Sequence, residues 1–346
     1  MNMEPRKRYD EIDLAKGIGM LAVIWGHLML GGSTNRFVYA FHIPLFFFLS
    51  GLLFRRERYR NFGAFVGHRA RTLLLPYAVF SAVTWLYWVV RNLVLDLPVK
   101  SWFSPLLQTV LAQGSGGFLV HNVALWFVTC LFVVEILYYF LAKLPAWATA
   151  LGCIVCGAIG WWVVQAHDGF DFTLLPWNME GAMTGVVFYG AGNLCARFVS
   201  RDAVLRRVQA HRICSLFLLL LLTAATFFGA RQNGRVTIGH ALLGEHLWLF
   251  YTNAFLGIAA SLLLSMLLMH WPVRFLKWLG RNSFFAMAIH IPVMVDVVWL
   301  VSKLCNVNID ALRYSYPYTV PAFFVILAIT CFWVFLLEKI RSRKQK

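Results

Sequence analysis

The sequence predicts an all-α, multi-pass membrane protein with about ten transmembrane helices and both ends of the chain in the cytoplasm. Two features of composition lead to this fold class. The 346 residues are 60% hydrophobic and only 13% charged, whereas soluble globular domains carry roughly 25% charged residues. Aromatic residues make up 16% of the chain, which excludes a disordered polymer, because such chains are polar and poor in aromatics.

Ten apolar segments can be recognised along the chain. A helix that crosses the hydrocarbon core needs about 20 mostly apolar residues. Apolar segments of this length are predicted to be helices because the bilayer offers no partner to an unpaired backbone group. The segments are Leu14–Leu30, Phe37–Phe54, Leu73–Val94, Val120–Leu141, Trp147–Val164, Met183–Phe198, Ile213–Ala230, Glu245–Met269, Phe284–Leu304 and Tyr318–Leu337.

The distribution of Lys and Arg sets the predicted orientation. Cytoplasmic loops next to the membrane hold an excess of these residues. With the N-terminus inside, 23 of the 31 Lys and Arg residues fall in inside loops and seven in outside loops, and Lys16 lies within the first helix. The inside residues include Arg6, Lys7 and Arg8 at the start and Lys344 and Lys346 at the end. An even number of spans is therefore expected.

Several other kinds of protein are disfavoured by the same data. The formal charge of +16 is spread between apolar runs and forms no basic patch of the kind that binds nucleic acid. Six of the seven cysteines lie inside apolar runs, so neither a disulfide framework nor a metal site is expected. We expect residues 1–346 to form one integral membrane domain, with no appended soluble domain.

The first predicted helix contains two ionisable residues, Lys16 and His27. Ionisable groups inside the bilayer are costly and are candidates for function. Eleven residues separate the two, which places them on one helix face and about 16 Å apart along the axis. A snorkelling lysine and a packing histidine are the alternative interpretation.

The second helix supplies a further histidine at a similar predicted depth. His42 lies in the segment YAFHIPLFFFLSG and follows a short turn after His27. Pro44 and the Ser50-Gly51 pair are typical of a helix that lines a cavity and approaches another backbone closely. Two imidazoles in such a pocket offer a general base and a second hydrogen-bonding group.

At this point the sequence resembles the membrane-bound acyltransferase family 3, and within it the fucose 4-O-acetylase-like branch. Five motifs, in order, carry the resemblance. They are YDEIDLAKGIGMLAVIWGH (Tyr9–His27), FHIPLFFFLSG (Phe41–Gly51), HRARTLLLPY (His68–Tyr77), LWFVTCLFVVE (Leu125–Glu135) and GRNSFFAMAIH (Gly280–His290). The resemblance implies a catalytic His27 with Lys16 as its paired basic residue. Arginine is commoner than lysine in the family at that position.

The resemblance also implies a location in a bacterial inner membrane and an activity. The activity is transfer of an acyl group from cytoplasmic acyl-CoA to a hydroxyl of an envelope sugar, polysaccharide or other envelope molecule. Acetyl-CoA is the expected co-substrate, with no bound cofactor, and membrane lipids are the remaining partner. Arg69 and Arg71, just before the third helix, are expected to bind donor phosphates. The alternative is that the arginines of this loop only fix the topology. The alternative function is a transporter or exporter of a glycan or lipid-linked intermediate, which would use the buried ionisable residues as relays.

Two more residues complete the predicted site. Glu135, in the fourth span, is costly to bury unless it is protonated or paired, and it is a candidate charge partner for a catalytic histidine or part of a structural bond. His290, in the ninth span, is expected near the inside end, where it would bind the donor or pack at the interface. His42 is expected to orient His27, to donate to the oxyanion or to position the acceptor.

Overall fold

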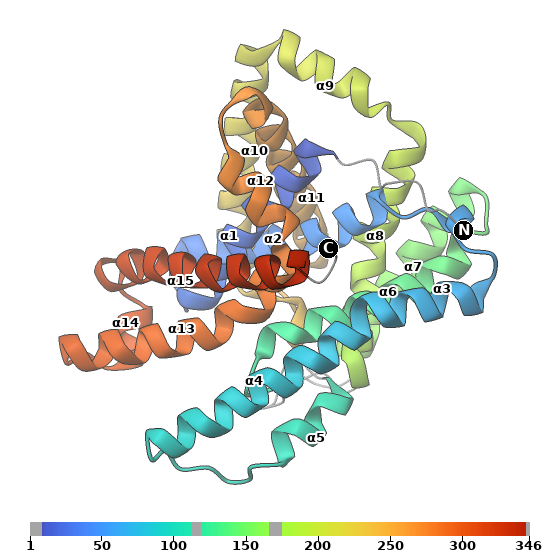
Figure 1. Cartoon of the computed structure of the whole chain (residues 1–346). Helices are drawn as coiled ribbons and strands as arrows, with labels where there is room; N and C mark the ends of the chain where they lie inside the picture. Colours follow the sequence, from blue (N-terminus) through green and yellow to red (C-terminus); the bar gives the residue numbers. More distant parts are fainter. Residues whose placement is uncertain (1–8, 113–118, 166–174, 344–346) are drawn as a thin grey trace.

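The computed structural model describes residues 9–112, 119–165 and 175–343 and is 84% helical. The five terminal basic residues Arg6, Lys7, Arg8, Lys344 and Lys346 lie outside these ranges. In Figure 1, α1, α2 and α11 lie near the centre of the molecule, and α4 and α5 extend away from it. Apart from two short strands, the regular structure of the described residues is helical, as the composition predicts.

The first half of the chain supplies the helices around the site. They are α1 (Asp10–Leu28), α2 (Gly32–Leu52), η1 (Arg56–Arg58), α3 (Phe62–Arg69), η2 (Ala70–Leu74), α4 (Leu75–Val94), α5 (Ser104–Leu111), η3 (Val123–Leu125), α6 (Trp126–Leu141) and α7 (Ala146–Gln165). The η2 segment is a π-helical turn that joins α3 to α4 without a break. Such turns occur within α-helices, frequently at functional sites.

The second half surrounds the other side of α1. It contains η4 (Pro176–Asn178), α8 (Met179–Phe198), α9 (Arg201–Ala210), α10 (Arg212–Asn233), β1 (Val236–Thr237), η5 (Ile238–His240), β2 (Leu242–Leu243), α11 (Leu247–Leu267), η6 (Leu268–His270), α12 (Arg274–Arg281), α13 (Ser283–Cys305), α14 (Ile309–Arg313) and α15 (Tyr316–Arg343). The two strands pair antiparallel, with Val236 opposite Leu243 and Thr237 opposite Leu242.

Seven helices among the described residues are long and apolar enough to cross a membrane. They coincide with seven of the ten predicted segments. The other three predicted segments form α1, α2 and α8, which are of similar length but less apolar. Four charged residues occur in the first seven positions of α1, and α8 is rich in glycine. These three helices pack against one another or against other helices in the interior. Little of their surface therefore has to be apolar enough to face lipid.

The outer helices carry the apolar surface. On α4, the exposed residues Val79, Val83, Leu86 and Val90 recur every three or four positions and form one stripe, the spacing of a helix face. Within a bilayer, such a stripe meets lipid chains. The structure therefore describes a polytopic membrane protein whose more polar helices lie at its centre.

Close contact between α2 and α8 depends on two glycines. A Cβ at Gly51 would overlap the carbonyl oxygen of Tyr189, and one at Gly192 would overlap the carbonyl oxygen of Phe48. Small residues let membrane helices approach closely and pack their backbones. This contact fixes the end of α2 beside α8, next to the cavity described below.

One end of the molecule gathers basic residues around the start of α1, and we call it the basic end. Lys277 and Arg281 of α12 pair with Asp10 and Asp13, respectively, at 2.7 and 3.0 Å. Arg201 of α9 pairs with the buried Glu11 and lies over the ring of Tyr9, 4.2 Å from its centroid. Figure 1 shows α9 crossing this end between α8 and α10.

These ion pairs lie outside the membrane-spanning segments, and they shift the pKa values of two of their members. The Lys277 ammonium lowers the pKa of Asp10 below its ordinary value. The hydrogen bond from Arg201 to the Glu11 carboxylate raises the pKa of the Arg201 guanidinium. Both effects stabilise the charged forms, so the start of α1 is held by charged contacts at neutral pH.

A candidate active site in two joined cavities

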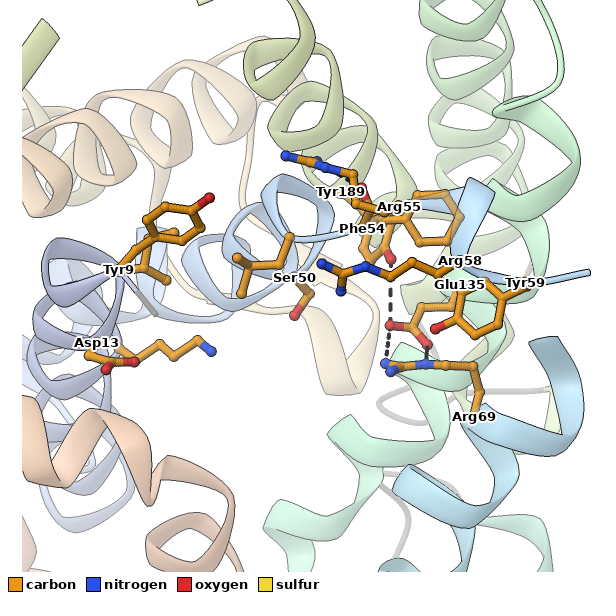
Figure 2. Close-up of a pocket in the computed structure, with 13 residues that line it drawn as sticks. Tyr9, Asp13, Ser50, Phe54, Arg55, Arg58, Tyr59, Arg69, Glu135 and Tyr189 are labelled. Atoms are coloured by element: carbon orange, nitrogen blue, oxygen red, sulfur yellow. Dashed lines mark hydrogen bonds and ion pairs between the residues drawn. The ribbon is translucent and has the colours of Figure 1, made fainter. Parts of the chain in front are cut away.

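A polar cavity of about 360 Å³ opens among the start of α1, the end of α2, η1, α3, α6 and α8. Three arginines from one short stretch, Arg55, Arg58 and Arg69, line it together with Lys16. In Figure 2, Tyr9 and Asp13 lie on one side of this cavity, the arginines and Tyr59 on the other, and Ser50 between them. Several cations around one cavity make it a suitable place for an anionic group.

Arg69 and Glu135 form a bidentate ion pair in the wall of the polar cavity. The Nε and one terminal nitrogen of Arg69 donate to the two oxygens of Glu135. The Tyr189 hydroxyl donates to the same carboxylate at 3.5 Å. The Glu135 side chain is 4% exposed and that of Arg69 is 17% exposed. This parallel geometry is the strong form of an arginine–carboxylate bond. Glu135 is thus paired with a predicted donor-binding residue and forms no ion pair with His27.

Arg71 lies elsewhere. It falls within the π-helical turn and is exposed, and it lines neither of the two cavities described here. Two residues along a helix point to nearly opposite sides. The arrangement that turns Arg69 toward α6 therefore turns Arg71 away from it. Of the predicted pair, the structure brings only Arg69 into the cavity.

An apolar cavity of about 200 Å³ adjoins the polar one. Both cavities are lined by Lys16 and Ser50, so the two spaces meet at these residues. The remaining wall is mostly apolar and includes Met20, Val23, Ile43, Phe46, Phe127, Leu131 and Met287. His27 lines the same cavity. Because Lys16 and His27 are eleven residues apart on α1, the path from one to the other is about 16 Å long.

Three histidines lie close together at the part of the apolar cavity that His27 lines. The rings of His27 and His290 are 5.2 Å apart, centroid to centroid, and inclined at 50°. His42 interacts electrostatically with both. His42 and His290 are buried, whereas His27 is half-buried. His290 therefore lies in the histidine cluster and does not line the polar cavity.

The hydrogen bonds of two of these rings fix their tautomers. The Nδ1 of His42 lies 2.7 Å from the carbonyl oxygen of Val38, and that of His290 lies 2.8 Å from the carbonyl oxygen of Met287. A carbonyl oxygen only accepts, so each Nδ1 carries the hydrogen. In the neutral ring, each Nε2 is then an acceptor. Neither neutral ring is able to donate from Nε2 to an oxyanion.

The end of α1 is held by residues that sequence reasoning did not identify. Arg313 donates to the carbonyl oxygens of His27 and Leu28, and Asn35 donates to the carbonyl oxygen of Gly26 at 3.0 Å. A cation at the last carbonyls of a helix complements the helix dipole. Arg313 is the last residue of α14, 286 residues away from His27, and no local motif marks it. These bonds hold the backbone that carries His27.

Among the described residues, no group of three His, Cys, Asp or Glu side chains is arranged to hold a metal ion. The comparisons with known proteins give one match. A family model described as an acyltransferase domain, that of acyltransferase family 3, matches residues 9–338. No curated protein and no solved structure matches the chain.

Proposed function

Given that the chain belongs to acyltransferase family 3, we propose that it takes an acyl group, most simply acetyl, from acyl-CoA. The acceptor is a hydroxyl of an envelope sugar or polysaccharide, as in the fucose 4-O-acetylase-like branch. The family supports a membrane acyltransferase in general and does not favour the transporter alternative. The observation that carries the proposal is the junction of a cationic cavity with an apolar one that reaches His27.

The two cavities suit the two parts of acyl-CoA. Its phosphates would lie in the polar cavity, where Arg55 and Arg58 supply charge-assisted hydrogen bonds. Lys16 would contribute a point charge at the junction, and Arg69 is held by Glu135. The less polar pantetheine arm would pass Ser50 and continue along α1, over about 16 Å, toward His27.

His27 is proposed as the general base. It would remove the proton of the acceptor hydroxyl as the oxygen attacks the thioester carbonyl. The new C–O bond forms, the C–S bond breaks, and the proton passes to the departing sulfur to give free CoA. Because His42 has its Nε2 available as an acceptor, we propose that it positions the acceptor hydroxyl. The alternative role as oxyanion donor does not fit the neutral tautomer.

The orientation follows from the basic end. Arg201, Lys277 and Arg281 contact the start of α1, where the polar cavity lies. Basic loops favour the cytoplasmic side. We therefore propose a bacterial inner membrane location with both termini and the polar cavity facing the cytoplasm, where acyl-CoA is made. Transfer would occur deeper in the bundle, at His27.

Purified protein in liposomes with radiolabelled acetyl-CoA tests the proposal. The measurements are CoA release and transfer of label to extracted envelope glycans. Wild type should show both signals, and His27→Ala should lose both. His211→Ala is the matched control, because His211 is exposed at the end of α9, and it should keep both signals. A wild-type protein that neither binds nor turns over acyl-CoA would contradict the proposal.

A further inference from the structure

His27 has no acidic partner of the kind that usually orients a catalytic histidine. None of the ion pairs among the described residues includes it. The acidic side chains of the surrounding helices are engaged elsewhere: Glu135 with Arg69, Asp13 with Arg281, and Asp296 with Arg91. A base that gains a proton in an apolar site needs another group to stabilise its second N–H.

His290 is the group placed to do this. It is 0% exposed, and its Nδ1 hydrogen is committed to the carbonyl oxygen of Met287. Its Nε2 is buried and has no hydrogen-bond partner. A buried acceptor with no partner is costly. Since the ring of His27 is 5.2 Å away, a turn of that ring toward the edge of His290 would satisfy the acceptor.

The comparison with His42 supports this choice. Both rings use Nδ1 in the same way, within their own helix. The aromatic neighbour of His42 is the ring of Tyr39, at 4.9 Å, whereas the neighbour of His290 is His27 itself. In addition, Met287, one turn before His290, lines the apolar cavity together with His27. The ring of His290 thus stands at the side of the base.

We infer that His290 is a positioning residue that accepts a hydrogen bond from His27 through Nε2 and so forms a histidine pair. The inference rests on the proposed function and deepens it. One nitrogen of His27 takes the hydroxyl proton, and the other keeps its own hydrogen, which points at His290. The imidazolium then gives the first proton to the departing CoA sulfur. His290 ends the cycle unchanged, so protons and charges balance.

The role predicts a specific kinetic pattern. His290 touches neither the donor phosphates nor the polar cavity, so His290→Ala should lower kcat about 100-fold, the typical contribution of an assisted base. KM for acetyl-CoA should stay within about twofold of the wild-type value, because the variant does not change the binding of the donor. His290→Gln keeps an acceptor oxygen on a side chain of similar length. The kcat of His290→Gln should therefore be at least tenfold higher than that of His290→Ala.

The experiment measures kcat and KM for CoA release by wild type, His27→Ala, His290→Ala and His290→Gln in liposomes, with and without added imidazole. Imidazole should restore activity to His290→Ala in a saturable manner, because the vacated space accepts the missing ring. A purely structural role would give no rescue by imidazole and no advantage of Gln over Ala, and either result would overturn the inference.

Two outcomes separate this inference from the proposed function. A tenfold rise in KM of His290→Ala with unchanged kcat would assign His290 to donor binding and overturn the histidine pair alone. If wild type releases no CoA from any acyl-CoA, the proposed function fails first. Should His290→Ala not fold, the kcat of His290→Gln still decides the question, because a value below about 10% of the wild-type kcat would contradict the acceptor role.

Discussion

The two cavities are built by different forces, although they share Lys16 and Ser50. Charged side chains hold the polar cavity: Arg69 with Glu135 in one wall, and Asp13 with Arg281 beside the other. Helix packing holds the apolar cavity, whose walls are mostly apolar side chains of α1, α2, α6 and α13, with Leu73 of η2 and Ala124 of η3. The difference matches the two parts of an acyl-CoA molecule.

The contrast also explains why the central helices look less like membrane helices than the outer ones. A lipid-facing helix such as α10 must be apolar nearly all round, and α10 is largely exposed. The helices α1, α2 and α8 face protein and cavity instead, so they tolerate charge and glycine. Part of the candidate site therefore lies in the less apolar helices: Lys16 and His27 belong to α1, and Ser50 to α2.

The largest expected effect is the loss of the buried ion pair. Glu135→Ala leaves Arg69 without its partner in a mostly buried wall, and breaking such a pair costs about 3 kcal/mol. The unfolding midpoint in detergent should fall clearly. The double variant Arg69→Met with Glu135→Leu should recover most of that loss, because no uncompensated charge remains. A fully stable Glu135→Ala would show that the pair does not hold this wall.

A test of the close packing between α2 and α8 comes next. Gly51→Ala places a methyl group against the carbonyl oxygen of Tyr189, and such overpacking costs on the order of 1–3 kcal/mol. Gly67→Ala is the matched control, since a Cβ there meets nothing within 4 Å. That variant should be neutral or slightly more stable. Equal thermal stability of the two variants would rule out close α2–α8 packing as a constraint.

The role of the arginines in the polar cavity is tested by enzyme kinetics. Arg58→Ala should raise KM for acetyl-CoA about tenfold without changing kcat, the loss of one charge-assisted bond. Arg60 is the matched control: it lies in the same exposed loop but does not line the polar cavity. Arg60→Ala should leave KM within about twofold. If both variants have the same KM, the loop acts only through its overall charge.

The smallest effect concerns the start of α1. Asp10 pairs with Lys277 at 2.7 Å but is 42% exposed, so the coupling should be below about 1 kcal/mol. The pKa of Asp10 is lowered from 3.8 in the folded protein, so the pair stabilises the fold above pH 3.8. This stabilisation is lost as pH falls below that value and Asp10 becomes protonated. A double-mutant cycle with Asp10→Asn and Lys277→Met, measured at pH 7 and pH 3, checks this. The coupling should be weaker at pH 3 than at pH 7, and equal coupling at the two pH values would contradict this assignment.

Much of the fold follows from local signals. Apolar length predicts all ten helical segments, and the eleven-residue spacing predicts that Lys16 and His27 share a face. The sequence does not reveal which of these helices meet lipid. That property depends on tertiary packing, which hides α1, α2 and α8 within the molecule and exposes one side of α4.

The site was less predictable because its key contacts join distant parts of the chain. Glu135 pairs with Arg69 across 66 residues, and only the fold reveals this partner. His290 was expected near the inside end of its helix. In the structure its ring lies 5.2 Å from that of His27, centroid to centroid, and no local signal marks this contact between α13 and α1.

The central claim is that the two cavities form one path from the donor phosphates to His27, and Ser50 at their junction offers the most direct test. Two variants are compared, Ser50→Ala and Ser50→Phe, by binding of 3′,5′-ADP, the phosphate-bearing part of CoA, and by CoA release from acetyl-CoA. We expect Ser50→Ala to behave like wild type. Ser50→Phe should bind 3′,5′-ADP with unchanged Kd and release no CoA. Wild-type CoA release by Ser50→Phe would contradict the account.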